Sequence, residues 1–279
     1  MILINGVEAD CVKVNDRGFQ YGDGLFETVE VLDGQPIFLE QHLLRLGMGC
    51  TKLSIPKPDI TQLAYEIRTV CKSANQAVLK IIITRGPGGR GYRQPEEIQT
   101  TRVITLHPFP EYPKSYSELG INARFCETRL GLNPALAGIK HLNRLEQVMA
   151  RTEWDEPNIQ EGIMLDINDQ VVEGTMTNLF YAKDNILYTA SLKMAGVAGI
   201  VRGLVKELTT KNSLTLIEHD YGKDVLLSAD EVFFCNSIIG IWPVKQIESV
   251  SFAVGSLTNQ LQTWLARLKN QEQQCDVKL

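Results

Sequence analysis

Residues 130–147, Leu130-Gly-Leu-Asn-Pro-Ala-Leu-Ala-Gly-Ile-Lys-His-Leu-Asn-Arg-Leu-Glu-Gln147, contain the most informative lysine of the chain. Lys140 follows a strand-like stretch and precedes a segment that is expected to form a helix from Leu142 to about Trp154. A side chain at such a junction can face a cleft, and a desolvated amine forms an imine with an aldehyde. A single lysine in front of a helix is most often solvated surface, so its role depends on the residues around it.

Glu173 is the second candidate, in Val171-Val-Glu-Gly-Thr-Met-Thr-Asn-Leu-Phe180. A carboxylate among strand residues needs a cationic partner, and a protonated pyridine nitrogen would be one. Glu173 would then keep that proton in place and strengthen the ring as an electron acceptor. The alternative is an ordinary strand glutamate that points into solvent.

Two loops offer binding sites for an anion. Ala195-Gly-Val-Ala-Gly-Ile-Val-Arg202 enters an expected helix, and the N–H groups at the positive end of a helix suit a phosphate monoester. Cys235-Asn-Ser-Ile-Ile-Gly-Ile-Trp-Pro243 follows an apolar run and would bring Ser237 to the same anion. Arg45, off the centre of an apolar helical stripe in the first half of the chain, would complete the phosphate site.

Short apolar runs alternate with segments of helical period, which predicts a mixed α/β fold. In the first half we expect strands at 1–5, 27–32, 77–85 and 102–107, and a helix through Leu39, Leu43, Leu46, Cys50 and Leu53. In the second half we expect helices at 142–154, 200–211 and 257–268, and strands at 122–127, 161–166, 171–173, 177–182 and 186–189. The last three of these strands are expected to form an antiparallel meander, and the last ten residues to fray.

The segment Pro108-Phe-Pro-Glu-Tyr-Pro113 has three prolines in six residues, which do not fit inside a sheet or a helix. We place the domain boundary there. The prediction is a smaller N-terminal α/β domain of residues 1–112, a linker of residues 113–120, and a larger, strand-rich C-terminal domain of residues 121–279 that contains Lys140 and Glu173.

Composition narrows the range of partners. The 279 residues carry a formal charge of -5, which gives no general field for nucleic acid and favours a small-molecule substrate. The six cysteines form no C-x-x-C pair and there are only four histidines, so we expect reduced thiols in a cytoplasmic protein and no metal site. We also expect no signal peptide and no membrane span, because apolar runs are short.

In order, spacing and context, these elements together resemble the fold-type IV pyridoxal 5′-phosphate (PLP) enzymes over essentially the whole chain, a family that includes branched-chain and D-amino-acid aminotransferases. The resemblance implies that Lys140 forms a Schiff base with PLP and that Glu173 binds its pyridine nitrogen. It assigns the phosphate to Ile200, Val201, Ser237 and Arg45. Val201 stands where many members have threonine, so only its N–H is available. A homodimer, with the coenzyme near the domain junction, is also implied.

Three segments resemble one branch of this family, the aminodeoxychorismate lyases: Asp16–Thr28, Thr84–Tyr92 and Leu130–Gln147. This resemblance implies elimination of pyruvate from 4-amino-4-deoxychorismate to give 4-aminobenzoate, a step towards folate. An aminotransferase on the same scaffold remains the alternative. A third interpretation is a non-catalytic globular protein in which the lysine and the loops are structural.

A substrate with two carboxylates calls for cationic and hydroxyl partners. Arg90 lies in the glycine-rich run Thr84-Arg-Gly-Pro-Gly-Gly-Arg-Gly-Tyr92, where backbone can approach a ligand closely. The candidate substrate-binding residues are Arg90, Tyr92, Arg85 and Arg144. Each arginine taken singly is more often a solvated or structural ion-pair residue.

Overall fold

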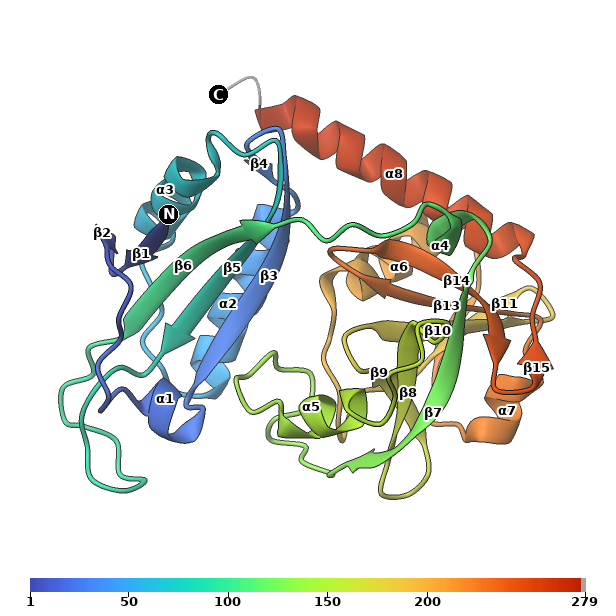
Figure 1. Ribbon diagram of the computed structural model, residues 1–279, viewed down its shortest axis with the longest axis horizontal. Coiled ribbons are helices and arrows are strands. Elements are labelled where there is room, and N and C mark those ends of the chain that lie inside the picture. The colour runs from blue at the N-terminus through green and yellow to red at the C-terminus, as the bar shows by residue number, and fades with distance from the viewer. Residues whose placement is uncertain (277–279) are drawn as a thin grey trace. The chain divides into compact units, whose positions relative to one another are not determined.

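The computed structural model describes residues 1–276, which divide into two compact units (Figure 1). The first unit contains Met1–Pro110, Lys140–Asn143 and the end of the last helix from Lys269. The second contains Glu111–Ile139 and Arg144–Leu268. The chain thus leaves the second unit between Ile139 and Lys140, whereas the sequence-based division assigns residues 121–279 to one C-terminal domain. Those domain limits remain a prediction.

The first unit is built on a six-stranded antiparallel sheet of order β2-β1-β6-β5-β3-β4. Its strands are β1 (Ile2–Ile4), β2 (Val7–Glu8), β3 (Gly24–Leu32), β4 (Gln35–Pro36), β5 (Gln76–Thr84) and β6 (Thr101–Pro108). Its helices are α1 (Arg17–Tyr21), α2 (Leu39–Lys52) and α3 (Ile60–Cys71). Figure 1 shows α2 beside the central strands of this sheet.

Alternation of side chains explains why the sheet of the first unit forms. In β5 every second residue is buried, and these residues are Ala77, Leu79, Ile81 and Ile83. Successive side chains of a strand point to opposite faces, so this set covers one face of the sheet. The apolar stripe of α2 is also buried and consists of Leu39, Leu43, Leu46 and Cys50. The sheet and the helix therefore each contribute one apolar face to the core.

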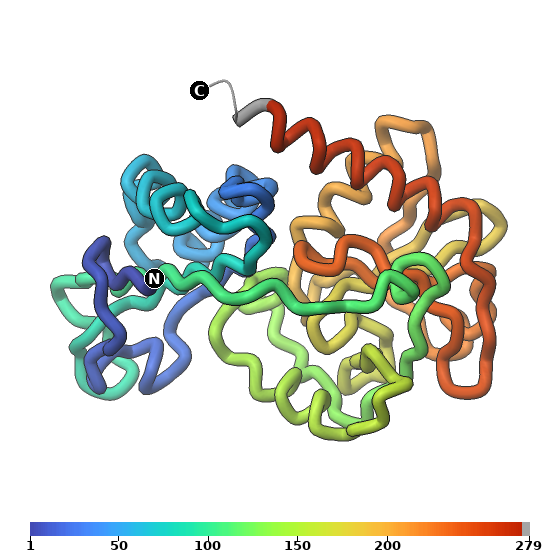
Figure 2. The backbone as a smooth tube through the Cα atoms, turned by 45° about the horizontal axis from the view of Figure 1, so that its top comes forward, coloured from blue at the N-terminus to red at the C-terminus, as the bar shows by residue number. Residues whose placement is uncertain are grey.

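The second unit contains a nine-stranded sheet of order β12-β11-β10-β13-β14-β7-β8-β9, with β15 paired to β14. Its strands are β7 (Ile121–Leu130), β8 (Glu161–Asp166), β9 (Val171–Gly174), β10 (Asn178–Lys183), β11 (Ile186–Thr189), β12 (Leu216–Glu218), β13 (Glu231–Asn236), β14 (Gly240–Ile247) and β15 (Val250–Ser251). Its helices are α4 (Ser115–Glu118), α5 (Leu145–Arg151), α6 (Ile200–Lys211), α7 (Lys223–Leu227) and α8 (Ser256–Asp276). In Figure 2 the segment that follows β6 runs as an extended green stretch towards α4.

The predicted meander in the second unit is wrong in its first pairing, because β9 and β10 are not neighbours in the sheet. β9 ends the sheet order beside β8, whereas β10 lies between β11 and β13. β13 comes from much later in the chain and takes the edge of β10, where Phe180 and Phe233 stack with ring centroids 5.0 Å apart. A distant apolar strand therefore replaces the expected neighbour.

Two predicted helix ends also need correction. α5 begins at Leu145 instead of Leu142, because the N–H of Leu142 donates to the carbonyl of Gly24 and keeps this part of the chain extended. α8 continues to Asp276, although we expected fraying from residue 270; residues 277–279 lie outside the described residues. Lys269 Nζ donates to Glu30 Oε2 at 2.6 Å and anchors this end of the helix. None of the helices in residues 1–276 combines the length and apolarity of a membrane span.

Candidate active site

Lys140 lies in extended backbone that is held on both sides. Before it, Gly138 forms a parallel bridge with Val197 of the second unit's glycine loop. After it, His141 forms an antiparallel bridge with Leu25 of β3. The ladder between β4 and β3 covers only the far end of β3, so residues 140–142 add to the edge of β3 near its start. The lysine backbone is thereby fixed without being part of a helix.

The side chain of Lys140 projects over an aromatic ring. Its Nζ lies 4.4 Å from the ring centroid of Phe26, and the Phe26 N–H donates to the Lys140 carbonyl at 3.0 Å. Gly24 lets residues 140–142 lie close to the start of β3, because a Cβ there would lie 2.8 Å from Leu142 Cδ1. The ring attracts a cationic amine and limits the directions in which the half-buried lysine can point.

Beneath this part of β3, α2 contributes a buried polar network. Glu27 Oε2 lies 2.6 Å from His42 Nδ1. Arg45 donates from Nε to Glu27 Oε1 at 2.8 Å and from Nη2 to Oε2 at 2.5 Å. This two-point pairing fixes the plane of the Arg45 guanidinium. Arg45 was predicted from sequence as a phosphate ligand, whereas Glu27 and His42 were missed.

The charges of this network follow from burial and proximity. Burial would raise the pKa of Glu27, but Arg45 and His42 outweigh burial and lower its pKa to about 2. Burial lowers the pKa of His42, and Arg45 and Lys140 act in the same direction against Glu27. At neutral pH Glu27 is therefore a carboxylate and His42 is neutral. Because a carboxylate only accepts, His42 Nδ1 carries the proton in their hydrogen bond.

Replacing Glu27 with glutamine is expected to lower the free energy of unfolding at pH 7 by about 3 kcal/mol. The pKa of Glu27 lies below its ordinary 4.5 in the folded protein. The stabilisation is therefore complete above pH 4.5 and is lost as the pH falls towards 2. Urea unfolding of wild type and Glu27→Gln at several pH values between 7 and 3 would measure the difference, which should shrink over the acidic part of this range.

The control for this titration is Glu8→Gln, which removes an exposed carboxylate from β2 in the same unit. It should leave the unfolding free energy almost unchanged at every pH, since exposed surface substitutions have small effects. A Glu27→Gln difference that stays constant from pH 7 to pH 3 would contradict the assigned ionisation.

In the second unit, Glu173 is buried on β9 and bound to the glycine loop. The Val197 N–H donates to Glu173 Oε2 at 2.8 Å, and Asn178 Nδ2 lies 3.4 Å from the same oxygen. Asn178 also donates to the Val197 carbonyl at 2.8 Å and accepts from the Gly199 N–H at 3.1 Å. Asn178 thus joins the carboxylate to the loop. It was missed from sequence, although it stands in the quoted segment that contains Glu173.

Two glycines let this loop approach its partners. Gly196 has φ +85°, and a Cβ there would lie 2.7 Å from Val172 Cγ1. A Cβ on Gly199 would lie 2.1 Å from Asn178 Oδ1. Side chains at either position would therefore push the loop away from β9 and Asn178.

The predicted phosphate contacts in the second unit lie at two turns. Ile200 and Val201 are the first residues of α6, whose leading N–H groups lack acceptors within the helix. Ser237 lies in the turn between β13 and β14, where Asn236 Oδ1 accepts from two backbone N–H groups. Arg202, next along α6, is buried and donates to the Ala190 carbonyl at 2.8 Å, so its guanidinium faces the protein.

Three of the four candidate substrate ligands belong to the first unit and one, Arg144, to the second. Arg144 lies in the second unit and donates from Nη2 to the Ile139 carbonyl at 3.1 Å. Burial lowers its pKa, while Glu173 and Glu146 act in the opposite direction, which places Arg144 in the electrostatic environment of Glu173. Arg90 and Tyr92 are exposed on the glycine-rich loop of the first unit.

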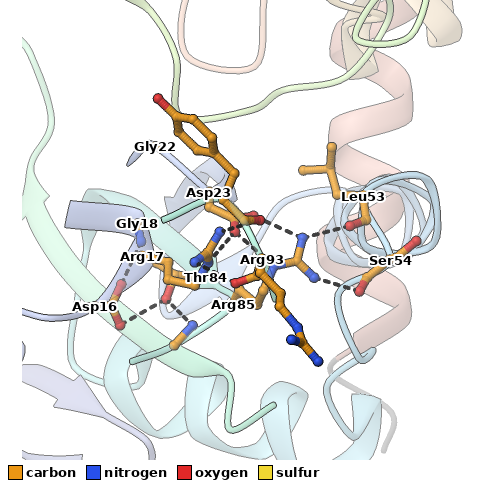
Figure 3. A network of polar contacts seen from close by, with 12 residues as sticks. Asp16, Arg17, Gly18, Gly22, Asp23, Leu53, Ser54, Thr84, Arg85 and Arg93 are labelled. Carbon is orange, nitrogen blue, oxygen red and sulfur yellow. Dashed lines mark hydrogen bonds and ion pairs between the residues drawn. The ribbon is translucent and has the colours of Figure 1, made fainter. Parts of the chain in front are cut away.

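Arg85 is buried in the first unit and bound entirely to protein groups in Figure 3. Its Nε and Nη2 donate to the Asp23 carboxylate at 2.8 and 3.0 Å. Its Nη1 and Nη2 donate to the carbonyls of Ser54 and Leu53 at 2.7 and 2.8 Å. These contacts use its donors for structure, so a direct role in substrate binding does not fit this geometry.

The donor set defines the kind of cofactor that the residues fit. The Lys140 amine would bind an aldehyde, and the negative charge of the buried Glu173 carboxylate, which accepts from the Val197 N–H, would suit a protonated ring nitrogen. The start of α6 suits a phosphate group. Among the side chains of residues 1–274, no cluster of His, Cys, Asp or Glu has the composition of a metal site.

The chain is similar in sequence and in fold to known proteins. A family model described as amino-transferase class IV matches residues 24–247. The aminodeoxychorismate lyase of Vibrio harveyi is 39% identical over 268 residues, covering 94% of this chain and 98% of that protein. The D-alanine aminotransferase of Bacillus licheniformis is 30% identical, with 95% of each chain covered.

Among solved structures, the crystal structure of 4-amino-4-deoxychorismate lyase from Pseudomonas aeruginosa has a TM-score of 0.93 and 43% identity. The similarity covers 96% of this chain and 98% of that one. The branched-chain aminotransferase of Escherichia coli has a TM-score of 0.86 and 26% identity. These similarities confirm the predicted mixed α/β fold.

Proposed function

Because the chain belongs to the amino-transferase class IV family, we propose that it is a PLP-dependent lyase converting 4-amino-4-deoxychorismate into 4-aminobenzoate and pyruvate. The observation that carries the proposal is the near full-length similarity to two aminodeoxychorismate lyases, at 39% and 43% identity. The D-alanine aminotransferase is 30% identical, which makes transamination the alternative to be excluded.

We propose that Lys140 binds the aldehyde of PLP and that Glu173 binds its ring nitrogen. The proposed phosphate ligands are the N–H groups of Ile200 and Val201, together with Ser237 and Arg45. When bound, PLP supplies an aldehyde that condenses with amines and a ring that accepts an electron pair. The pairing of Arg45 with Glu27 supports its role, since it fixes the guanidinium that meets the phosphate.

The residues of this chain then have distinct tasks in the elimination. Lys140 takes the proton from the substrate carbon that bears the amine. The bond from the ring carbon to the enolpyruvyl oxygen breaks, and the electron pair of the former C–H bond makes the six-membered ring aromatic, which makes the step hard to reverse. The leaving group departs as enolpyruvate, which takes up one proton, from Lys140 or from a group beside it, and becomes pyruvate. Glu173 holds a proton at the cofactor ring nitrogen, and the Val197 N–H keeps Glu173 in place.

For the two substrate carboxylates we propose Arg90 and Arg144, with the hydroxyl of Tyr92 as a further contact. Arg85 has its donors engaged by Asp23 and two backbone carbonyls, so we propose a supporting role for it. We further propose that the protein is a cytoplasmic homodimer that supplies 4-aminobenzoate for folate synthesis. Sedimentation velocity of the coenzyme-loaded protein tests the dimer.

The decisive test of the activity is 4-aminobenzoate formation from enzymatically prepared 4-amino-4-deoxychorismate without any added keto acid. The proposed lyase should produce 4-aminobenzoate and pyruvate in equal amounts, above a no-enzyme control. The aminotransferase would instead be established by two results together. The coenzyme-loaded protein would release neither product, and it would turn over D-alanine or a branched-chain amino acid with a keto acid.

A further inference from the structure

One buried arginine donates hydrogen bonds to three successive backbone carbonyls of the glycine-rich loop, residues 86–93. Arg17 Nη1 donates to the carbonyls of Gly91 and Arg93 at 3.0 and 3.3 Å, and Nη2 to that of Tyr92 at 3.4 Å. Its Nε donates to Asp23 Oδ2 at 2.9 Å (Figure 3). Arg17 is only 4% exposed, so these bonds are shielded from water.

The preceding residue secures the base of the same loop. Asp16 Oδ2 accepts from the hydroxyls of Thr84 and Thr101 at 3.0 and 2.6 Å, at the end of β5 and the start of β6. The Arg17 N–H donates to the Gly86 carbonyl at 3.0 Å. Asp16 therefore joins the two strand ends that flank the connection containing the loop, while the Arg17 side chain holds residues 91–93 of the loop.

The Arg17 side chain is itself anchored. Asp23 accepts from both Arg17 and Arg85, and Arg85 continues to the Ser54 carbonyl beyond α2. Burial would raise the pKa of Asp23, but Arg85 and Arg17 outweigh it, so its pKa lies below its ordinary value. The carboxylate stays charged at neutral pH and keeps both guanidinium groups in position.

The side chains on the outer side of the loop are mostly exposed. Arg90 is exposed, and Tyr92 is 88% exposed and contacts the ring of Tyr21, with 5.6 Å between the ring centroids. Gly86, Gly88, Gly89 and Gly91 all have positive φ, a conformation that costs glycine little to enter or leave. A segment with few buried contacts opens easily unless specific bonds hold it.

We propose that Arg17 is a positioning residue that holds the glycine-rich loop in the one shape that presents Arg90 and Tyr92 to the substrate carboxylates. This inference rests on the proposed function, in which those two side chains bind the substrate. Arg17 itself touches no substrate, because its guanidinium is buried and faces backbone carbonyls.

The test compares Arg17→Lys with wild type in the coenzyme-loaded protein. Lysine keeps the positive charge beside Asp23, but it lacks the planar guanidinium whose N–H groups donate to several carbonyls at once. Hydrogen exchange of residues 88–93 and trypsin cleavage after Arg90 should both become faster by about tenfold or more. If the loop then holds its binding shape about a tenth of the time, KM for the substrate rises about tenfold while kcat changes little.

The matched control is Arg102→Lys, which makes the same change from guanidinium to ammonium in the partly buried ion pair of Arg102 with Glu66 in the same unit. It should lower stability while leaving loop exchange and KM unchanged. A second variant, Gly89→Ala, strains φ +79° and places a Cβ 2.5 Å from the Arg93 carbonyl oxygen. The same Cβ would lie 3.1 Å from Arg17 Nη1, so the substitution should disturb the contact between Arg17 and the loop, release the loop and raise KM.

The outcomes separate this inference from the proposed function. A folded Arg17→Lys protein in which residues 88–93 exchange hydrogen as slowly as in wild type would overturn the inference. Faster exchange of the loop in either variant without a rise in KM would also overturn it. If Arg17→Lys does not fold, Gly89→Ala decides by the same two measurements. A wild-type protein without lyase activity would refute the proposed function, while the exchange data would still decide whether Arg17 holds the loop.

Discussion

Lys140→Ala is expected to abolish 4-aminobenzoate formation, with kcat lowered by about 10⁴-fold or more, as for loss of a covalent and proton-transferring group. Lys140 is held by bridges on both sides and projects over Phe26, and no other lysine is placed in this way in the described part of the chain. Steady-state assays with coenzyme in excess measure the loss. Borohydride reduction followed by peptide mass spectrometry should locate the coenzyme on the peptide that contains Lys140.

Lys80→Ala is the matched control for this substitution. Lys80 Nζ lies 5.5 Å from the centroid of the same Phe26 ring, but its backbone belongs to the regular ladder of β5. Its removal should lower kcat by less than about tenfold, since it has no part in the proposed proton transfer. Coenzyme attached to Lys80, or full activity in Lys140→Ala, would reassign the catalytic lysine.

Glu173→Gln is expected to lower kcat by about 10²- to 10³-fold, in the range of a lost acid–base or charge interaction. Glutamine keeps an oxygen that can accept from the Val197 N–H, so the loop should remain in place. It removes the negative charge that, in the proposed function, keeps the cofactor ring nitrogen protonated. Activity of the coenzyme-loaded variant, with coenzyme content measured separately, distinguishes slower chemistry from weaker binding.

Glu161→Gln provides the comparison for Glu173. Glu161 is equally buried on the adjacent β8, where it accepts from the hydroxyls of Thr175 and Thr177. Burial raises its pKa, with the surrounding hydrogen bonds acting in the opposite direction. Its substitution should reduce stability and change kcat by less than about tenfold. Equal losses of kcat in both variants would show that Glu173 acts only through the fold.

Local patterns were enough to predict most elements. The β-branched alternation of 77–85 predicted β5, and the apolar spacing from Leu39 predicted α2. The expected strands at 177–182 and 186–189 are joined by Asp184 and Asn185, and both residues have positive φ, as a type I′ turn requires. α3 was missed, although Asp59 caps its start by accepting from the Gln62 N–H. These features are local because each depends on neighbours within one turn or one strand.

Element ends failed where a distant partner intervened. The start of α5 is delayed because residues 140–142 add to β3, which lies far earlier in the chain. α8 persists beyond the predicted fraying point, with its end anchored by the ion pair of Lys269 with Glu30. In both cases a long-range hydrogen bond or ion pair outweighs the local preference.

By itself the sequence determined the fold class and the family, and it singled out Lys140 as the candidate catalytic residue and Glu173 as a candidate cofactor ligand, because these depend on periodicity and on short motifs. Only the tertiary structure decided which arginines are engaged by the protein itself. Arg85 is bound inside the first unit, Arg45 is oriented by Glu27, and Arg17 holds the loop that carries Arg90. The physical reason is that a guanidinium takes its role from the acceptors around it, and folding brings those acceptors from distant parts of the chain.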